Sequence, residues 1–323
     1  MKTSVMVLLI VAVSLVAAGL ILCVVGLALA PGETIGEKFL SLGTSDFVSE
    51  ETVISEKISG IDLQASTARV EILKATDGVT RVALYERAQE KSEVSVVDGV
   101  LTIRPKEIEW YKKISLFSPE ESTVTVYLAE PMLETMNLKT STGAVRVAEE
   151  ILAKNATVEF STAKIEFAAS VSEMLRVSGS TGDVSLRGAQ YGNLEVKTST
   201  GDISLSGGSA REVSLRVSTG EISVESFACG SLAVVSSTGE QEYEGVTVDG
   251  AMTLESDTGD ISIEDCSVAS ATITTATGDV KGRFNSPMIF FATTDTGRVR
   301  VPESTEGGLC KITTDTGNII FEG

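Results

Sequence analysis

The sequence predicts an all-β protein, a parallel β-helix or solenoid with coils of 19–20 residues, preceded by one N-terminal transmembrane helix. Three observations lead to this fold class: a long uncharged stretch at the start of the chain, a Thr-Gly element that recurs at a nearly constant interval, and apolar positions at fixed distances from that element. The 323-residue chain has 29 Gly, 6 Pro and only 5% aromatic residues, which favours strands joined by tight turns over packed helices.

The first segment, residues 4–30, contains no charged residue. At about 1.5 Å per residue, a helix of this length can span the hydrocarbon core of a bilayer, which is about 30 Å thick. Lys2 precedes the segment and Glu33 follows it, so the positive-inside rule places the N-terminus in the cytoplasm. We therefore predict a single-pass cell-membrane protein with a signal anchor at residues 1–30, a linker at 31–51 and an extracytoplasmic C-terminal domain.

A cleaved signal peptide is the alternative, because Ala28-Leu29-Ala30 has the small-x-small form of a cleavage site. The apolar run is longer than the apolar core of a typical signal peptide, which has about 7–15 residues. Pro31 would also become the first mature residue, where we expect cleavage to be disfavoured. These two features favour the uncleaved anchor.

The rest of the chain repeats a short element, usually Ser or Asp, then Thr-Gly, then an acidic residue or Asn, and then Ile or Val. Successive copies are 19 or 20 residues apart, which is the signature of a repeat architecture. The corner position of the ten copies is occupied by Gly143, Ala163, Gly182, Gly201, Gly220, Gly239, Gly259, Gly278, Gly297 and Gly317.

When the ten units are aligned on this corner position, residues seven and five before it and two and four after it are apolar, with few exceptions such as Gln241. Alternate side chains of a strand point to the same side, so each unit contains two short strands that direct these residues inward. A weaker third inward site lies seven and nine positions after the corner. Stacked coils would lie about 4.8 Å apart. The last coil, which ends at Gly323, is unfinished, and the sequence leaves open whether it pairs with another molecule.

One earlier copy of the element, at Ser66–Val70, belongs to the same set. Residues 73–135 follow it as an insertion with alternating runs of its own and a hairpin turn signal at Asp98-Gly99. We predict a β-solenoid domain over residues 52–323, in which the insertion caps the N-terminal end and residues 136–323 form the regular coils.

The chain has a net charge of −19 and no His. It lacks the basic footprint of a nucleic-acid-binding protein, so nucleic acid is excluded as a partner. Without His, the Ser-His and Cys-His pairs of many nucleophilic enzymes cannot form within the chain.

Consecutive coils carry a carboxylate directly after the corner residue, and we call these six residues the acidic column: Asp183, Asp202, Glu221, Glu240, Asp260 and Asp279. At a spacing of about 4.8 Å they could bind Ca²⁺ or another hard cation, which takes carboxylate and carbonyl oxygens. The alternative is turn chemistry on a solvated edge. We favour the turn interpretation, because the nine-residue calcium repeat is absent. We therefore predict no cofactor, and Ca²⁺ at the acidic column stays the alternative.

The insertion holds the only Trp of the chain beside a local basic cluster, in the run Trp110, Tyr111, Lys112 and Lys113. These side chains could contact a lipid surface or a partner, as Trp, Tyr and Lys do at membrane interfaces. A hairpin that packs its aromatic rings onto the cap is the plainer interpretation.

The cysteines of the predicted solenoid, Cys229, Cys266 and Cys310, fall in inward columns. Cys229 and Cys266 lie two coils apart, about 9.6 Å along the axis, which exceeds the limit of about 7 Å between the Cα atoms of a disulfide. We predict buried free thiols that pack as small apolar residues.

The serial Ser-Thr-Gly-Asp-Ile/Val units, with Ser122–Leu128 leading through Glu130-Pro131 into the first uninterrupted coil, resemble the putative-adhesin proteins of bacteria, a β-strand-repeat family of unknown function. The resemblance covers about residues 52–323. Members are often envelope proteins, some encoded beside envelope-stress regulators, so the resemblance implies a location more than a reaction.

Outward positions repeat along the rod, as in the serine row Ser185, Ser204 and Ser223. We therefore predict a non-enzymatic surface, adhesion or interaction protein of the cell envelope. Its partners would be the membrane, through the N-terminal helix, and an unknown envelope protein or glycan. One alternative is an accessory or scaffold for envelope-stress signalling. Another is a β-helix enzyme acting on polysaccharides, which the lack of a non-repeating polar constellation disfavours.

Overall fold

The computed structural model describes residues 47–88, 90–106 and 121–322, and their regular structure consists of strands. No helix in this part of the chain is long and apolar enough to cross a membrane. The predicted signal anchor lies outside the described residues. Strand β1 (Phe47–Val53) begins inside the predicted linker, so the strand structure starts before the predicted boundary at residue 52.

The chain divides into two compact units. The larger one comprises residues 48–86, 90–106 and 121–323 and carries the solenoid described below. The described part of the smaller unit is limited to Phe47, Arg87 and Ala88, and there the Arg87 guanidinium lies 5.9 Å from the centroid of the Phe47 ring.

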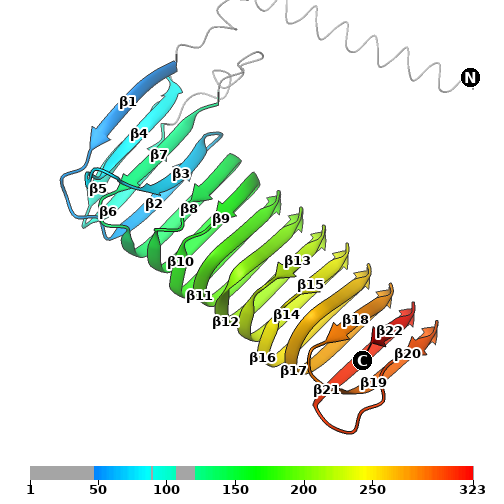
Figure 1. Cartoon of the computed structure of the whole chain (residues 1–323). Coiled ribbons are helices and arrows are strands. Elements are labelled where there is room, and N and C mark those ends of the chain that lie inside the picture. The colour runs from blue at the N-terminus through cyan, green and yellow to red at the C-terminus, as the bar shows by residue number, and fades with distance from the viewer. Residues whose placement is uncertain (1–46, 89, 107–120, 323) are drawn as a thin grey trace, which may run out of the picture. The chain divides into compact units, whose positions relative to one another are not determined.

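The regular coils consist of strands that pair in parallel with their neighbours (Figure 1). Leu175 pairs with Leu194, and Val184 pairs with Ile203, so paired positions are 19 residues apart, as the Thr-Gly interval predicts. The predicted parallel β-solenoid is confirmed. Its strands are β8 (Met132–Val147), β9 (Leu152–Phe167), β10 (Ser170–Thr181), β11 (Val184–Thr200), β12 (Ile203–Thr219), β13 (Ile222–Glu225), β14 (Ala228–Thr238), β15 (Gln241–Glu244), β16 (Thr247–Thr258), β17 (Ile261–Thr277) and β18 (Val280–Phe284).

The predicted inward columns form the hydrophobic core. Around the corner at Gly182, the four inward side chains are Leu175, Val177, Val184 and Leu186, and none is more than 1% exposed. The weaker third inward site is buried as well, at positions that include Ala189, Tyr191, Phe227, Val246 and Val248. Each coil therefore encloses its apolar side chains only together with the coils above and below it.

Backbone contacts between coils explain the glycine at nine of the ten corners, where Ala163 is the exception. The Gly182 N–H donates to the carbonyl oxygen of Thr200 in the next coil at 2.8 Å. Gly182 also has a φ of 136°, and a Cβ atom there would lie 1.8 Å from the carbonyl oxygen of Ala163 in the preceding coil. Both the left-handed backbone and the close stacking of corners exclude larger residues at this position.

The cysteine prediction is confirmed for the described residues: Cys229, Cys266 and Cys310 are buried and free. Burial raises the pKa of the Cys229 and Cys266 thiols to about 11, and that of Cys310 to about 12. All three are therefore protonated at neutral pH and lack the thiolate character of a reactive cysteine.

At the C-terminal end, the stacking order differs from the chain order. The last coil, β21 (Gly308–Thr316) and β22 (Ile319–Glu322), lies between the coil of β17 and β18 and the coil of β19 (Met288–Thr296) and β20 (Val299–Arg300). Ala271 pairs with Cys310 on one side, and Phe290 pairs with Cys310 on the other. The end of the chain is thus inserted one layer inside the rod, as the red strands of Figure 1 show.

This inversion makes β19 and β20 the outermost layer, and each pairs with one strand only within the described part of the chain. Val299 occupies an inward column yet is 44% exposed, because no further coil covers it. The unfinished last coil, in contrast, has partners on both sides. Any pairing of this end with another molecule would therefore involve β19 and β20 and not the last coil of the chain.

The first coil contains β2 (Gly60–Ala65) and β3 (Arg69–Lys74), which both pair in parallel with β8. Strands of the insertion extend it: β6 (Val100–Pro105) pairs with β2, and β7 (Thr123–Leu128) pairs with β3. The hairpin predicted at Asp98-Gly99 is present between β5 (Ser92–Val97) and β6, and both turn residues have positive φ. The insertion therefore continues the two faces of the solenoid at its N-terminal end.

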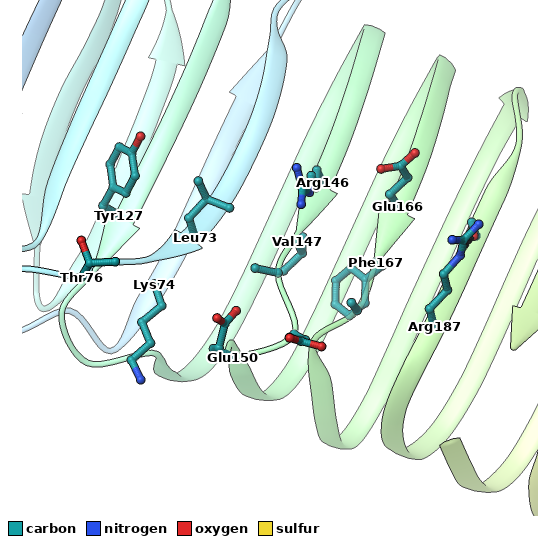
Figure 2. Close-up of a pocket in the computed structure, with 14 residues that line it drawn as sticks. Leu73, Lys74, Thr76, Tyr127, Arg146, Val147, Glu150, Glu166, Phe167 and Arg187 are labelled. Atoms are coloured by element: carbon teal, nitrogen blue, oxygen red, sulfur yellow. Dashed lines mark hydrogen bonds between the residues drawn. The ribbon is translucent and has the colours of Figure 1, made fainter. Parts of the chain in front are cut away.

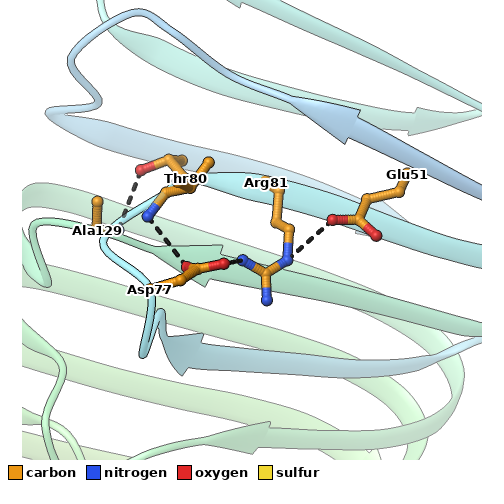
Figure 3. Close-up of polar contacts among 6 residues, drawn as sticks. Glu51, Asp77, Thr80, Arg81 and Ala129 are labelled. Atoms are coloured by element: carbon orange, nitrogen blue, oxygen red, sulfur yellow. Dashed lines mark hydrogen bonds and ion pairs between the residues drawn. The ribbon is translucent and has the colours of Figure 1, made fainter.

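One arginine ties together the strands of this end (Figure 3). Arg81, in β4 (Arg81–Arg87), forms ion pairs with Asp77 at 2.6 Å and Glu51 at 3.0 Å. Its guanidinium lies 4.3 Å from the centroid of the Tyr127 ring. The hydrogen bond from Arg81 also lowers the pKa of the Asp77 carboxyl. Strands β1, β4 and β7 are thus connected by one partly buried cation.

Candidate functional site

The acidic column runs along the corners of consecutive coils, and its aspartates bind the backbone of the next coil. The Asp202 N–H donates to the Asp183 carboxylate at 3.0 Å, and the Glu221 N–H donates to Asp202 at 2.8 Å. The same contact joins the Asp279 N–H to Asp260 at 2.8 Å. The aspartates therefore cap the turn of the neighbouring coil, which is a structural role that sequence reasoning assigned only generally to turn chemistry.

Glu221, a glutamate of the column, is surrounded by other carboxylates. Burial raises the pKa of the Glu221 carboxyl, and the nearby charges of Glu242, Asp202 and Glu240 raise it further. Among the described residues, no group of three or more Asp, Glu or Cys side chains converges in a way that could hold a metal ion. Ca²⁺ binding along the column stays a prediction.

The second predicted contact site, Trp110, Tyr111, Lys112 and Lys113, lies outside the described residues. Its role at a lipid surface or partner stays a prediction as well.

The serine row is placed by the strands as the sequence predicts. Ser185 pairs with Ser204, and Ser204 pairs with Ser223, so the three hydroxyl groups lie in register on one outward face. All three side chains are half-buried between their neighbours. The row begins next to a groove of about 630 Å³.

Figure 2 shows this groove, which lies between the end of β3 and the first regular coils. Strands β3 and β8 pair over Val70–Ile72, where β8 ends at Val147, while β3 continues to Lys74. One wall comes from Leu73, Lys74, Thr76 and Tyr127. The other comes from residues 146–150, where β8 ends, and from residues 166–168, Ser185 and Arg187 of the next coils. The groove is therefore an opening between the end of β3 and the turn that follows β8.

Three charged side chains line the outer wall of the groove, namely Arg146 from β8, Glu166 from β9 and Arg187 from β11 (Figure 2). Glu166 pairs with Lys164 at 2.7 Å, and the hydrogen bond from Lys164, with smaller contributions from both arginines, lowers the pKa of its carboxyl. The Nε–H group of Arg187 donates to the Ser185 hydroxyl at 3.0 Å. The arginines form no ion pair among the described residues.

Sequence reasoning did not identify this groove. The sequence does contain one indication of the groove, at the position five residues after each corner. Three consecutive coils have Ala148, Ala168 and Arg187 there. Two small residues in an outward column leave a hollow, and a long cationic residue borders it. The end of β8 at Val147, beside which β3 continues to Lys74, has no sequence signal of comparable strength.

A family model described as Toastrack DUF4097 matches residues 58–321, which is most of the predicted solenoid domain. The family resemblance found in the sequence is therefore confirmed. No curated protein matches the chain in sequence.

The chain is also similar to solved structures. One is described as a putative lipid binding protein from Parabacteroides distasonis ATCC 8503, with 16% identity, a TM-score of 0.47 and coverage of 87% of this chain and 98% of that chain. A putative adhesin from Parabacteroides merdae ATCC 43184 has 11% identity, a TM-score of 0.46 and the same coverage. A putative adhesin from Bacteroides fragilis NCTC 9343 has 16% identity, a TM-score of 0.39 and coverage of 86% of this chain and 98% of that chain.

Proposed function

We propose that this chain, which belongs to the Toastrack DUF4097 family, is a non-enzymatic surface or adhesion protein of the cell envelope that presents the outer faces of its solenoid to a partner. The observation that carries the proposal is the register of the coils. Equivalent outward positions stack directly on one another, as Ser185, Ser204 and Ser223 do, so the faces form extended arrays. An array of repeated side chains suits the binding of an elongated ligand, whereas catalysis needs a unique set of residues at one place.

The distribution of perturbed groups supports a binding role over catalysis. Burial raises the pKa of Tyr243, whose ring belongs to the hydrophobic core, and that of Tyr191, which lines a second pocket whose lining includes no Asp, Glu or Cys. Active sites usually combine perturbed groups with a cleft. The lining of the described groove includes no Cys, and its Ser185 hydroxyl contacts Arg187, which cannot act as a base.

The membrane part of the proposal rests on the sequence. An uncharged segment at residues 4–30 would anchor the chain, and the solenoid would then stand outside the cell. Anchoring would hold the outer faces close to the cell surface, where envelope proteins and glycans are the accessible partners.

A tagged full-length chain, cross-linked in intact cells and recovered under denaturing conditions, tests this function. We expect a defined envelope protein or glycan to be recovered with it. A soluble chain with no specific partner would overturn the proposal. In parallel, the purified full chain is incubated with a glycan panel, and release of shorter products would favour an enzyme instead.

A further inference from the structure

The outermost layer of the solenoid, β19 and β20, leaves the hydrophobic core open at its C-terminal end (Figure 1). The inward positions of this layer hold Phe290, Ala292, Val299 and Val301, and none of these side chains is fully buried. The equivalent side chains of the layer beneath are all buried. The core therefore ends in an uncovered apolar surface, and surfaces of this kind mark interaction sites.

The corner of the outermost layer also leaves a backbone group without a partner. In the layers beneath, the N–H group of the corner glycine donates to the next layer outward, as Gly278 does to Thr316 and Gly317 does to Thr296. Gly297 occupies the same position in the outermost layer, and no layer of described residues lies beyond it. An unpaired sheet edge of this kind is a template for a further strand.

The opposite end of the solenoid shows which kind of strand covers this sheet. There β5 pairs antiparallel with β6 and places Val94 opposite Ile103, and Val96 opposite Leu101. Strand β6 in turn pairs with β2, which continues the sheet through β8. The N-terminal edge is therefore covered by an antiparallel strand whose alternate side chains are apolar. The same kind of strand would suit the open C-terminal edge.

A second copy of the chain can supply an antiparallel strand on both sides of the corner at once. The inward side chains lie five and three positions before Gly297, at Ala292 and Thr294, and two and four positions after it, at Val299 and Val301. If the second copy is turned over about a two-fold axis through this corner, its β19 runs antiparallel to β20. Ala292 then faces Val301 of the second copy and Thr294 faces Val299, so inward side chains meet inward side chains.

The same arrangement brings opposite charges together. Asp295 lies beside Asp315 of the layer beneath, so a carboxylate is its neighbour there. Arg298 lies above the uncharged Asn318, whose Oδ1 accepts a hydrogen bond from the Arg298 N–H group at 3.1 Å. Neither Asp295 nor Arg298 forms an ion pair among the described residues. In the two-fold pair, Asp295 of each copy lies opposite Arg298 of the other.

Charge also limits where two copies can meet. The chain has a net charge of −19, so two copies repel each other over most of their surface. The acidic column ends at Asp279, and the next two layers hold Asn318 and Arg298 at the same position. The outermost layer, residues 288–301, contains two arginines and one aspartate. This end of the solenoid is therefore a place where two copies can approach.

We propose that the outermost layer binds the same layer of a second copy, so that two solenoids pair end to end about a two-fold axis at Gly297. Each copy covers the open core of the other. The assembly closes after two chains, because a two-fold contact uses the same surface on both. The inference goes beyond the proposed function, which concerns the outer faces of the coils and not their end.

Light scattering of the purified full chain in a mild detergent, over a range of concentrations, tests this pairing. A contact the size of one coil is small, so we expect a reversible dimer with a Kd on the order of 10–100 µM and no larger species. Asp295→Arg and Arg298→Asp should each raise the Kd at least about tenfold, because attractive contacts become repulsive. A mixture of these two variants should form a heterodimer about as tightly as the wild type, since the facing charges are again opposite. The variant with both substitutions should likewise recover the dimer.

Two control variants separate this contact from other causes. Arg216→Asp makes the same charge change at an exposed arginine of β12, in the middle of the solenoid, and should leave the Kd unchanged. Val299→Lys should raise the Kd at least about tenfold, whereas Val97→Lys, at an exposed valine of β5, should not. Melting curves verify that all variants fold.

A monomer at every concentration would overturn the inference, as would single variants that dimerise like the wild type or a mixture that stays monomeric. Open-ended oligomers that Val97→Lys weakens would show head-to-tail stacking instead. If a monomeric chain still recovers a defined envelope partner from cells, the proposed function stands and this inference fails.

Discussion

The Tyr243 hydroxyl donates a hydrogen bond to Oε1 of Gln241 at 2.8 Å inside the solenoid. Gln241 stands in an inward column where neighbouring coils have Ile222 and Ile261, yet its side chain is fully buried. Its amide nitrogen donates to the Ser236 hydroxyl and to the carbonyl oxygen of Glu255, each at 2.8 Å. The polar residue that interrupts the apolar column is therefore satisfied by partners from two coils.

We expect Gln241→Ala to lower the free energy of unfolding by about 1–3 kcal/mol, because the Tyr243 hydroxyl and the Ser236 hydroxyl would lose buried partners. The double variant Gln241→Ile with Tyr243→Phe removes both polar groups and restores the apolar column. It should recover most of that loss. Urea unfolding followed by circular dichroism measures both, and an equal loss in the two variants would contradict the network's role.

The sequence predicted the register and the core because every coil repeats the same columns, and a repeated pattern of ten units leaves little freedom. That same regularity hid the order of the last coils. Phe290 and Cys310 are both apolar residues of one column, so either coil could stack on Ala271 without changing the pattern. Likewise, the partners of Gln241 stand in other columns, Ser236 and Tyr243 in its own coil and Glu255 in the next, so the pattern of a single column does not show them.

The inverted order of the last two coils can be tested by cross-linking. Thr277 pairs with Thr316, so cysteines at these two positions should form a disulfide under mild oxidation, because paired Cα atoms at about 4.8 Å lie within disulfide range. Cysteines at Thr277 and Thr296 serve as the matched control. They should not cross-link, since Thr316 lies between them. Mass spectrometry of the digested protein identifies the linked peptides, and the reverse result would restore the chain order.

The corner glycine Gly182 and the turn glycine Gly188, six residues further on, differ in how much space surrounds them, which gives a paired test. A Cβ at Gly182 would lie 1.8 Å from the Ala163 carbonyl oxygen, whereas none at Gly188 would meet an atom within 4 Å. Both residues have positive φ. We expect Gly188→Ala to cost about 1 kcal/mol for the left-handed backbone alone, and Gly182→Ala to cost at least about 2 kcal/mol more because adjacent coils must separate. Similar melting temperatures for the two variants would contradict the close stacking of corners.

The burial of Glu221 and the carboxylates around it predict how one variant responds to pH. Burial and the charges of Glu242, Asp202 and Glu240 raise the pKa of Glu221 in the folded protein above its ordinary value. Ionisation of Glu221 therefore costs the folded state stability at neutral pH, and this cost disappears as the pH falls through the raised pKa. Glu221→Gln removes the charge and should raise the free energy of unfolding at pH 7 by a few tenths of a kcal/mol, because exposed like charges interact weakly.

At about pH 3, where Glu221 is protonated in both states, the Gln variant and the wild type should have the same melting temperature. Glu212→Gln controls for the loss of one charge, since Glu212 is exposed on a different face of the solenoid. Thermal melting of the three proteins at the two pH values makes the comparison. A gain in Glu221→Gln that is equal at both pH values, or equal to that of Glu212→Gln, would show that the burial of Glu221 and its neighbouring carboxylates are not its source. A gain confined to neutral pH and to Glu221 would show instead that the glutamates lower the stability of a corner that the aspartates support.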